Sequence, residues 1–254
     1  MLAVVLFLAF LTAGPAQSQQ KPTPSPGVPV LIELFTSEGC SSCPPADRFI
    51  EYLDTQPIAG ANLIVLSEHV DYWDRHGWRD PFSSSAVSER QIMYGKKFRI
   101  KDVYTPQFVI DGSRESDADD AKIVSAIRES AGEKKVGVQL RIGQSDAHRV
   151  KVRVETEATA SPLINVDVYL AVALNHAESR VGGGENARRV LTHTAVVRQL
   201  MKIGSLKRGE QFSRDVELKT EEFSDQPLRI IAFLQERESR KVHGAAIAHV
   251  GTQH

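Results

Sequence analysis

The chain has 254 residues, two of them cysteines, with a net charge of −1 and 41% hydrophobic residues. The near-zero charge and the lack of a basic run give no electrostatic reason to expect nucleic acid as a partner. The hydrophobic content is enough for a packed core, and two cysteines are too few for a small secreted scaffold held together by many disulfides.

The first segment of the chain has the pattern of an export signal. Leu2 to Leu11 is an apolar stretch that is too short to cross a bilayer as a helix, and Ala16-Gln17-Ser18 fits an Ala-x-Ala-like cleavage site. Prolines and small polar residues follow up to Pro29, a composition typical of an extended spacer. We therefore expect a signal peptide over 1–18, a Pro-rich linker over 19–29, and an exported protein, periplasmic or secreted, without stable membrane insertion after cleavage.

The following segment predicts alternating strands and helices. Val30–Thr36 is a nearly continuous apolar run, typical of a strand buried on both faces, and Asn62–His69 is a second strand. Pro44 favours a helix that begins there and runs to about Leu53, so the two strands are expected to be parallel. Further along, the sequence predicts a helix over Ser84–Phe98, a strand over Phe108–Ile110 with an Asp-Gly turn after it, and a helix over Asp117–Ala131.

After Lys135 the sequence texture changes to period-two alternation. Val136–Ile142 and Val150–Glu155 alternate apolar and polar residues, as half-buried strands do. Five further strands are expected, over Ile164–Leu174, Val190–Met201, Phe212–Leu218, Leu228–Leu234 and Gly244–Val250. We therefore expect an α/β domain over 30–133 followed by a mostly antiparallel β-sandwich domain over 134–254.

The two cysteines stand three apart, in Cys40-Ser41-Ser42-Cys43, between the first strand and the first helix. A helix N-terminus favours the thiolate, which is the reactive form of cysteine. We expect Cys40 to be the exposed nucleophile, because it lies on the loop side. Cys43, at or beside the start of the helix, would resolve the mixed disulfide.

A proline at the start of the third strand is compatible with a cis peptide bond. It stands in Val103-Tyr104-Thr105-Pro106-Gln107. Together with the Cys-x-x-Cys at a strand-to-helix junction, this segment resembles the thioredoxin fold. The resemblance implies a cis Pro106 beside the dithiol and a Thr105 whose backbone groups pair with an extended substrate strand.

The chain also resembles a family of secreted bacterial proteins known as a domain of unknown function, with a thioredoxin-like N-terminal half. The motif around the cysteines, Leu34 to Asp47, carries this resemblance. Matching segments in both halves support it: His69–Trp73, Gly77–Phe82, Val103–Gln107, Gly184–Asn186, Leu191–His193 and Val196–Gln199. Gly39 stands where thioredoxins carry a tryptophan, and the Gly-Pro pair between the cysteines is absent, so a general reductase role is not implied.

Several side chains follow the second strand and are expected near the cysteine loop, because function gathers beyond the carboxyl ends of parallel strands. His69 and Asp71 are candidate substrate-binding residues. His69 either exchanges protons with Cys43, serves as a metal ligand, or is a hydrogen-bonded structural histidine. Trp73 and Trp78 either line a substrate groove or fill a satellite core.

In the second half, Gly182-Gly183-Gly184 has no Gly-Lys-Ser/Thr after it and is not a phosphate loop. His193, with Arg188 and Arg189, either forms a surface site or belongs to a solvated β-rich face, and we expect the latter.

Three functions fit these observations. The first is an exported thiol–disulfide oxidoreductase without a cofactor or metal, acting on protein or small thiol partners through Cys40, Cys43, Thr105 and Pro106. The second is a copper(I)-handling protein that uses Cys40, Cys43 and His69, since thiolates suit a soft ion. The third is a binding or scaffold protein in which the cysteine pair is a structural disulfide. The sequence favours the first.

Overall fold

The computed structural model describes residues 27–146, 148–158, 165–206, 209–223 and 225–251. The expected signal peptide and most of the expected linker lie outside these residues. In the part of the chain that the structure describes, no helix is both long and apolar enough to span a membrane.

The order of elements follows the predicted one. The first half contains β1 (Val28–Thr36), α1 (Cys43–Thr55), β2 (Ala61–His69), the 3₁₀ helix η1 (Tyr72–Arg75), α2 (Ser85–Phe98), β3 (Gln107–Ile110), β4 (Arg114–Ser116) and α3 (Asp120–Ala131). The second half contains β5 (Val138–Ser145), β6 (Arg149–Thr156), β7 (Val166–Arg180), β8 (Val190–Leu206), β9 (Ser213–Lys219), the 3₁₀ helix η2 (Glu221–Phe223), β10 (Leu228–Glu236) and β11 (Val242–Val250).

The chain starts with a thioredoxin-like βαβ unit. β1 and β2 are parallel, with Thr36 opposite His69 at their carboxyl ends, and β3 runs antiparallel to β1 on its other side. The expected Asp-Gly turn between β3 and β4 is confirmed, because Asp111 and Gly112 both have positive φ angles. Apolar residues of α1 and α3 pack on one face of β1, whereas α2 packs on the opposite face, against Phe35.

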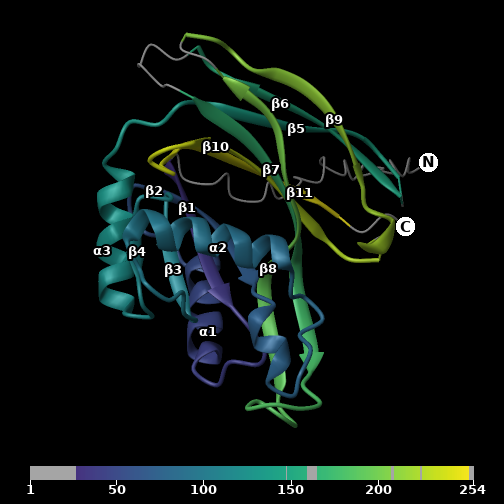
Figure 1. The fold of residues 1–254 in the computed structure, drawn as a ribbon. Coiled ribbons are helices and arrows are strands. Elements are labelled where there is room, and N and C mark those ends of the chain that lie inside the picture. Colours follow the sequence, from purple (N-terminus) through teal and green to yellow (C-terminus); the bar gives the residue numbers. More distant parts are fainter. Residues whose placement is uncertain (1–26, 147, 159–164, 207–208, 224, 252–254) are drawn as a thin grey trace, which may run out of the picture.

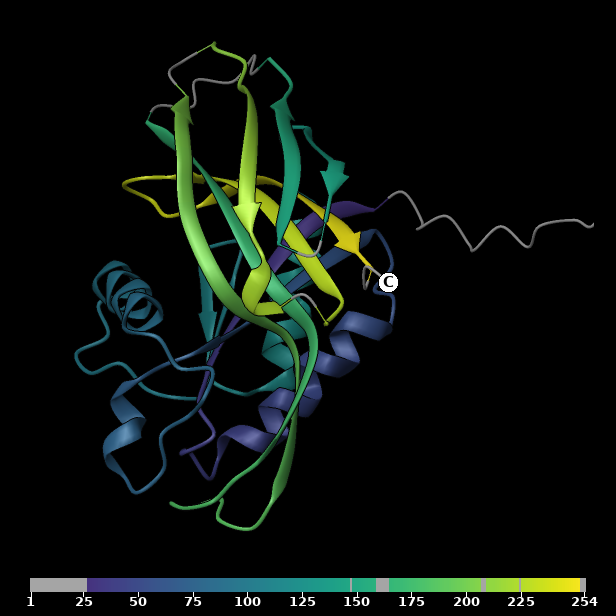
Figure 2. The same ribbon diagram turned by 90° about the vertical axis from the view of Figure 1, so that its right-hand side faces the viewer.

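The second half does not clearly form a separate sandwich domain, so that part of the expected fold is corrected. Among the strands of the described residues, all but three lie in one eight-stranded sheet, in the order β11-β10-β7-β8-β2-β1-β3-β4. β8 joins the βαβ unit by pairing with β2, where Val196 is opposite Ser67. β7 and β8 have 15 and 17 residues, longer than predicted, so their hairpin runs from the three-stranded sheet down to the helical end of the molecule (Figures 1 and 2).

The remaining strands form a small antiparallel sheet, in the order β5-β6-β9. Alternate valines of β6 face β7, β8 and β10 of the large sheet and make one hydrophobic core with them. The period-two alternation that predicted these strands therefore reflects one buried and one exposed face. Figure 1 shows this sheet at the end of the molecule opposite the amino end of α1.

Candidate functional site

The two cysteines form a disulfide at the amino end of α1. Cys43 is the first residue of the helix, Ser42 is its N-cap, and the two cysteine Cα atoms are 5.4 Å apart. The predicted place of Cys43 is therefore confirmed. The predicted exposure of Cys40 is wrong, because both cysteines are fully buried.

The cis proline lies beside Cys40. The Thr105–Pro106 peptide bond is cis, as the resemblance to thioredoxin implied. The Sγ atom of Cys40 is 3.8 Å from the carbonyl oxygen of Thr105 and 3.3 Å from the hydroxyl of Ser42. In the disulfide the sulfur has no proton, so Ser42 is the donor. After reduction, the Cys40 thiol has the Thr105 carbonyl as an acceptor within reach.

Trp73 supports the same corner of the site. Its indole N–H donates to the Thr105 hydroxyl at 2.7 Å, and its side chain also packs against the cluster around Phe35 and Tyr94. A Cβ atom added at Gly39 would lie 3.2 Å from the Cβ of Trp73. The small residue before Cys40 therefore lets a tryptophan from η1 approach the cysteine loop from the side.

The tip of the β7–β8 hairpin covers the cysteine loop and explains the burial of Cys40. The side-chain amide of Asn186 donates to the carbonyl oxygens of Glu38 and Cys40, both at 2.9 Å. The Glu185 carboxylate accepts from the backbone N–H of Ser41 at 3.0 Å. These contacts close over the disulfide from a part of the chain more than 140 residues away.

Glu38 is the centre of the contacts between the cysteine loop and the hairpin. Its buried carboxylate accepts from the Trp78 indole at 2.7 Å and from the Ser179 hydroxyl, and it lies 3.2 Å from Nε2 of His193. The ring of Trp78 also packs on Gly182, where an added Cβ would lie 2.7 Å from the ring. Trp78 therefore anchors the hairpin to the cysteine loop.

Two histidines lie under this cover. The rings of His69 and His193 are buried and 4.6 Å apart, centroid to centroid, and Phe82 packs against both. Nδ1 of His69 is 2.7 Å from Asp80, which also accepts from the backbone N–H of Glu38 at 2.9 Å. The sequence analysis expected His193 to lie on a solvated face, and this expectation is wrong. Its side chain is buried, because its side of β8 packs against the βαβ unit.

Asp71 belongs to a different set of contacts from these histidines. Its carboxylate accepts from the Ser88 hydroxyl of α2 at 2.5 Å, and its backbone N–H donates to the same hydroxyl at 3.0 Å. The structure thus brings Trp73 and Thr105 to Cys40, and His69 and Trp78 to the contacts around Glu38 and Asp80. It places Asp71 at the junction with α2.

Two carboxyl groups of the site have shifted pKa values, in opposite directions. Burial raises the pKa of Asp47 to about 6; attraction from His193 and a hydrogen bond from Thr36 offset this only in part. Burial also disfavours the ionised form of Asp80, but the charge and hydrogen bond of His69, together with the backbone N–H groups of Glu38 and Phe82, outweigh it and lower the pKa of Asp80 to about 2. The site therefore holds one carboxyl that keeps its proton into the mildly acidic range and one that does not.

The family model described as a protein of unknown function, DUF1223, matches residues 31–235. The chain belongs to the DUF1223 family. Among functionally curated proteins, none matches this sequence.

Two solved structures share the fold of this DUF1223 protein over most of its length. The first is a protein of Agrobacterium tumefaciens, structural genomics target AtR35, with 24% identity and a TM-score of 0.64 over 91% of this chain and 99% of that one. The second is HBP35 of Porphyromonas gingivalis, with 15% identity and a TM-score of 0.67 over 87% of this chain and 75% of that one. Both are similar in fold, which supports a thioredoxin-like architecture for the DUF1223 chain.

Geometry gives the copper(I) alternative no support in this DUF1223 protein. Among the residues that the structure describes, no three His, Cys, Asp or Glu side chains are grouped so that they could hold a metal ion. The sulfurs of Cys40 and Cys43 are bonded to each other, and His69 is paired with Asp80.

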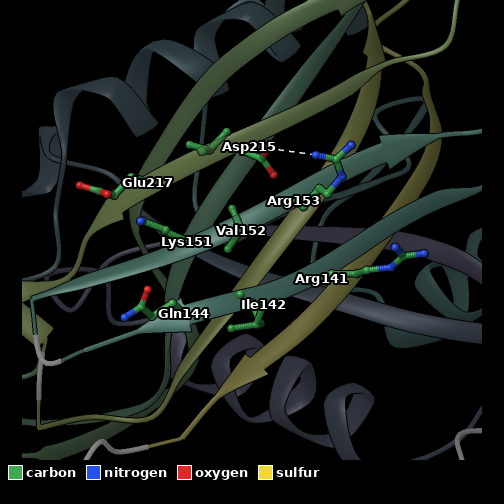
Figure 3. Close-up of a pocket in the computed structure, with 10 residues that line it drawn as sticks. Arg141, Ile142, Gln144, Lys151, Val152, Arg153, Asp215 and Glu217 are labelled. Atoms are coloured by element: carbon green, nitrogen blue, oxygen red, sulfur yellow. Dashed lines mark hydrogen bonds and ion pairs between the residues drawn. The ribbon is translucent and has the colours of Figure 1, made fainter.

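A hollow of about 620 Å³ lies on the three-stranded sheet (Figure 3), at the end of the molecule opposite the amino end of α1. Charged side chains from β5, β6 and β9 line it together with apolar ones, and several of the charged groups form ion pairs. Arg153 is 2.9 Å from Asp215, and Arg149 is 2.9 Å from Glu217, which also lines the hollow. The charged groups of this face are therefore paired across neighbouring strands. The disulfide remains the candidate site.

Sequence reasoning missed the buried polar residues around the cysteine loop. These are Glu38, Asp47, Asp80 and Asn186. Each lies inside a segment that carries the family resemblance, but their partners come from distant parts of the chain. One signal in the sequence could have found them. Each is an acidic or amide residue inside one of these segments, at a position where no turn or helix cap accounts for it.

Proposed function

We propose that this DUF1223 protein is an exported thiol–disulfide oxidoreductase that exchanges disulfides with protein thiols. The observation that carries the proposal is the position of the Cys40 sulfur, 3.8 Å from the carbonyl oxygen that precedes the cis Pro106. The amino end of a 13-residue helix at Cys43 adds a partial positive charge that favours a thiolate. The export signal expected over 1–18 would place this chemistry in an oxidising compartment, where disulfides persist.

The reaction follows from the state seen in the structure. A partner thiolate attacks the Cys40 sulfur, the Cys40–Cys43 bond breaks, and its electron pair moves to Cys43. A second partner thiol then attacks the mixed disulfide, so the partner is oxidised and Cys40 and Cys43 are left reduced. The same steps in reverse reduce or rearrange a partner disulfide. Because Asn186 and Trp78 hold the hairpin over the cysteine loop, the tip must move aside before a partner reaches Cys40.

A structural role for the disulfide is the second candidate, and a specific observation favours it. Both cysteines are fully buried, whereas an exchange enzyme presents one sulfur to its partner. In this case the disulfide would hold the cysteine loop in place for the hairpin. Closing so short a loop removes little chain entropy, so such a disulfide would stabilise the fold only weakly by that route.

The test is the reduction potential of the Cys40–Cys43 pair in the folded protein, measured by equilibration in glutathione buffers with thiol trapping. We expect a value in the range of about −120 to −270 mV, where exchange enzymes lie. A value below about −300 mV would identify a structural disulfide. As a second readout, Cys43→Ser should form a mixed disulfide with oxidised glutathione through Cys40, and Cys40→Ser should form far less.

A further inference from the structure

We propose that a second hollow, between α2 and β8, binds a small amphipathic carboxylate, an anion with a single charge and an apolar chain. This α2–β8 hollow has a volume of about 480 Å³. It is lined by α2 with its N-cap, by Tyr169 of β7 and by Val197–Met201 of β8. It does not include the disulfide, and the inference does not depend on the proposed function.

The hollow exists because β8 loses one of its two neighbours. β2 pairs with β8 only where Ser67 is opposite Val196. Among the strands of the described residues, β7 alone pairs with β8 after that point. Successive side chains of a strand point to opposite faces, so a hollow lined by the five consecutive residues Val197–Met201 borders the edge of β8. α2 runs beside this edge (Figure 1).

Much of the lining is apolar. α2 contributes Val87 and Met93, and β8 contributes Val197, Leu200 and Met201. Met93, Leu200 and Met201 are only half-buried, so they present apolar surface that no part of the chain covers fully. Unbranched methionine side chains adapt to ligands of different shape. The volume lies in the range of about 300–1,000 Å³ that is typical of small-molecule sites. These features suit an apolar chain.

The charge of the lining is positive. Its charged members are Arg90 and Arg198, and no acidic residue lines the hollow. Arg90 is neutralised by its ion pair with Glu33 at 2.5 Å. Arg198 makes no ion pair within the described part of the chain. Burial lowers its pKa, and the attraction of Glu222 and Asp80, neither of which is within ion-pair distance, offsets this only in part. Arg198 is therefore a half-buried cation without an anionic partner.

The guanidinium of Arg198 is held in place. β8 has a bulge at Arg198, because the residues on either side of it pair with consecutive residues of β7. The guanidinium carbon is 5.6 Å from the ring centroid of Phe82 and 5.8 Å from that of Phe223, and Nη1 donates to the carbonyl of Pro81 at 3.3 Å. A planar guanidinium fixed in this way has further N–H groups for a carboxylate, which accepts two parallel hydrogen bonds from it.

A single carboxylate matches the polar groups of the hollow. One unpaired arginine balances one negative charge, whereas a phosphate monoester carries up to two. Ser84, the N-cap of α2, makes no side-chain hydrogen bond to the helix, so its hydroxyl is a second donor in the same hollow. It lies three residues after Pro81, the acceptor of Arg198, so both donors lie toward one end of the hollow. The apolar chain of the ligand then extends along α2 and β8.

The test is isothermal titration of the full chain with sodium octanoate, with hexanoate and 1-octanol as comparison ligands. We expect octanoate to bind one-to-one and at least about tenfold more tightly than hexanoate, because two more CH₂ groups are buried. It should also bind at least about tenfold more tightly than 1-octanol, which lacks the charge. Arg198→Gln should weaken octanoate binding by about tenfold or more, through the loss of charge-assisted hydrogen bonds. Arg180→Gln, at an exposed position of β7 outside the hollow, is the matched control and should bind octanoate like the native protein.

A second variant keeps the test decisive if Arg198→Gln does not fold. Met93→Trp fills the hollow from the side of α2 and should also weaken octanoate binding by about tenfold or more. Native protein that does not bind octanoate at millimolar concentration would overturn the inference. So would equal affinities for octanoate and 1-octanol, or affinities of Arg198→Gln or Met93→Trp within twofold of the native value. None of these results bears on the proposed exchange reaction, which has its own test in the reduction potential.

Discussion

The side-chain amide of Asn186 donates a hydrogen bond to the carbonyl oxygen of Cys40 at 2.9 Å. Asn186 is fully buried, and its second amide proton goes to the carbonyl of Glu38 at the same distance. One side chain at the tip of the β7–β8 hairpin thus satisfies two carbonyls of the cysteine loop. Through this contact the hairpin covers the Cys-x-x-Cys of the βαβ unit, and the disulfide is closed to solvent.

Asn186→Ala should make the disulfide easier to reduce. The variant loses two buried hydrogen bonds, each worth about 1 kcal/mol, so the tip of the hairpin should open more often. We expect dithiothreitol to reduce the disulfide at least about tenfold faster, because about 1.4 kcal/mol corresponds to a factor of ten. Thiol trapping over time at pH 7 measures this rate.

The control for this prediction is Thr192→Ala, an exposed position on β8 of the same hairpin. It should leave the rate of reduction unchanged. An Asn186→Ala protein that is reduced at the native rate would show that the hairpin tip does not limit access to Cys40.

Asp47 and Asp80 should affect stability with opposite dependences on pH. The pKa of Asp80 is lowered in the folded state to about 2, so its contribution is complete above its unfolded pKa near 4 and is lost as pH falls toward 2. The pKa of Asp47 is raised to about 6, so its ionisation costs stability as pH rises from about 4 to 6. The two shifts correspond to roughly 2–3 kcal/mol each at neutral pH.

The measurement is urea unfolding of the native protein, Asp80→Asn and Asp47→Asn at several pH values between 3 and 7. Relative to the native protein, Asp80→Asn should become less stable as pH rises, and Asp47→Asn should become more stable. Differences that run in the same direction for both variants would contradict the opposite shifts.

Asp111→Ala should destabilise the whole fold. Asp111 accepts from the backbone N–H of Leu31 at 2.9 Å and from Nζ of Lys135 at 2.6 Å, and its own carbonyl accepts from the N–H of Val242. Removing its carboxylate leaves the buried ammonium of Lys135 without its nearest charge. We therefore expect a loss of about 3–5 kcal/mol in the free energy of unfolding.

Asp111→Asn separates the two parts of this contribution. Asparagine tolerates the positive φ angle at this turn and still accepts from Leu31, but it does not pair with the charge of Lys135. Urea unfolding should place Asp111→Asn between the native protein and Asp111→Ala. If both variants unfold like the native protein, Asp111 does not link the turn to β1 and β11.

The sequence predicted the elements well because each has a local signal. The apolar run of β1, the prolines after Cys43, and the Asp-Gly turn at Asp111 act over a few residues, and the structure follows them. The alternation in β6 likewise predicted which residues face the core. Local signals of this kind do not depend on where distant parts of the chain lie.

The continuous sheet and the closed site depend on distant contacts and could not be predicted in this way. Nothing local to Val196 indicates that it will pair with Ser67, and nothing local to Asn186 indicates that its amide will bind the carbonyl of Cys40. The same limit explains why Cys40 was expected to be exposed: a loop before a helix is exposed unless another segment covers it.

A second buried network lies on the opposite face of β1, where α2 packs. Nε of Arg90 is 2.5 Å from the carboxylate of Glu33 and 3.6 Å from that of Glu68, and the hydroxyl of Tyr94 donates to Glu33 at 2.6 Å. Burial and the neighbouring Glu33 raise the pKa of Glu68 well above its usual range, with Arg90 offsetting this in part. Arg90 therefore pairs most closely with Glu33, while burial and the charge of Glu33 disfavour the ionised form of Glu68.

Arg90→Met and Glu68→Gln should consequently have very different effects. Arg90→Met leaves the charge of Glu33 buried without its partner and should cost about 3–5 kcal/mol in the free energy of unfolding at pH 7. Glu68→Gln keeps the size of the side chain and removes a charge that burial disfavours, so it should cost little near pH 4. Because the pKa of Glu68 is raised in the folded state, the native protein should lose stability as pH rises. The Glu68→Gln variant should therefore become more stable than the native protein above pH 5. Urea unfolding at pH 4 and pH 8 measures both effects, and a Glu68→Gln protein that loses as much stability as Arg90→Met would show that Glu68 is the ionised partner of Arg90.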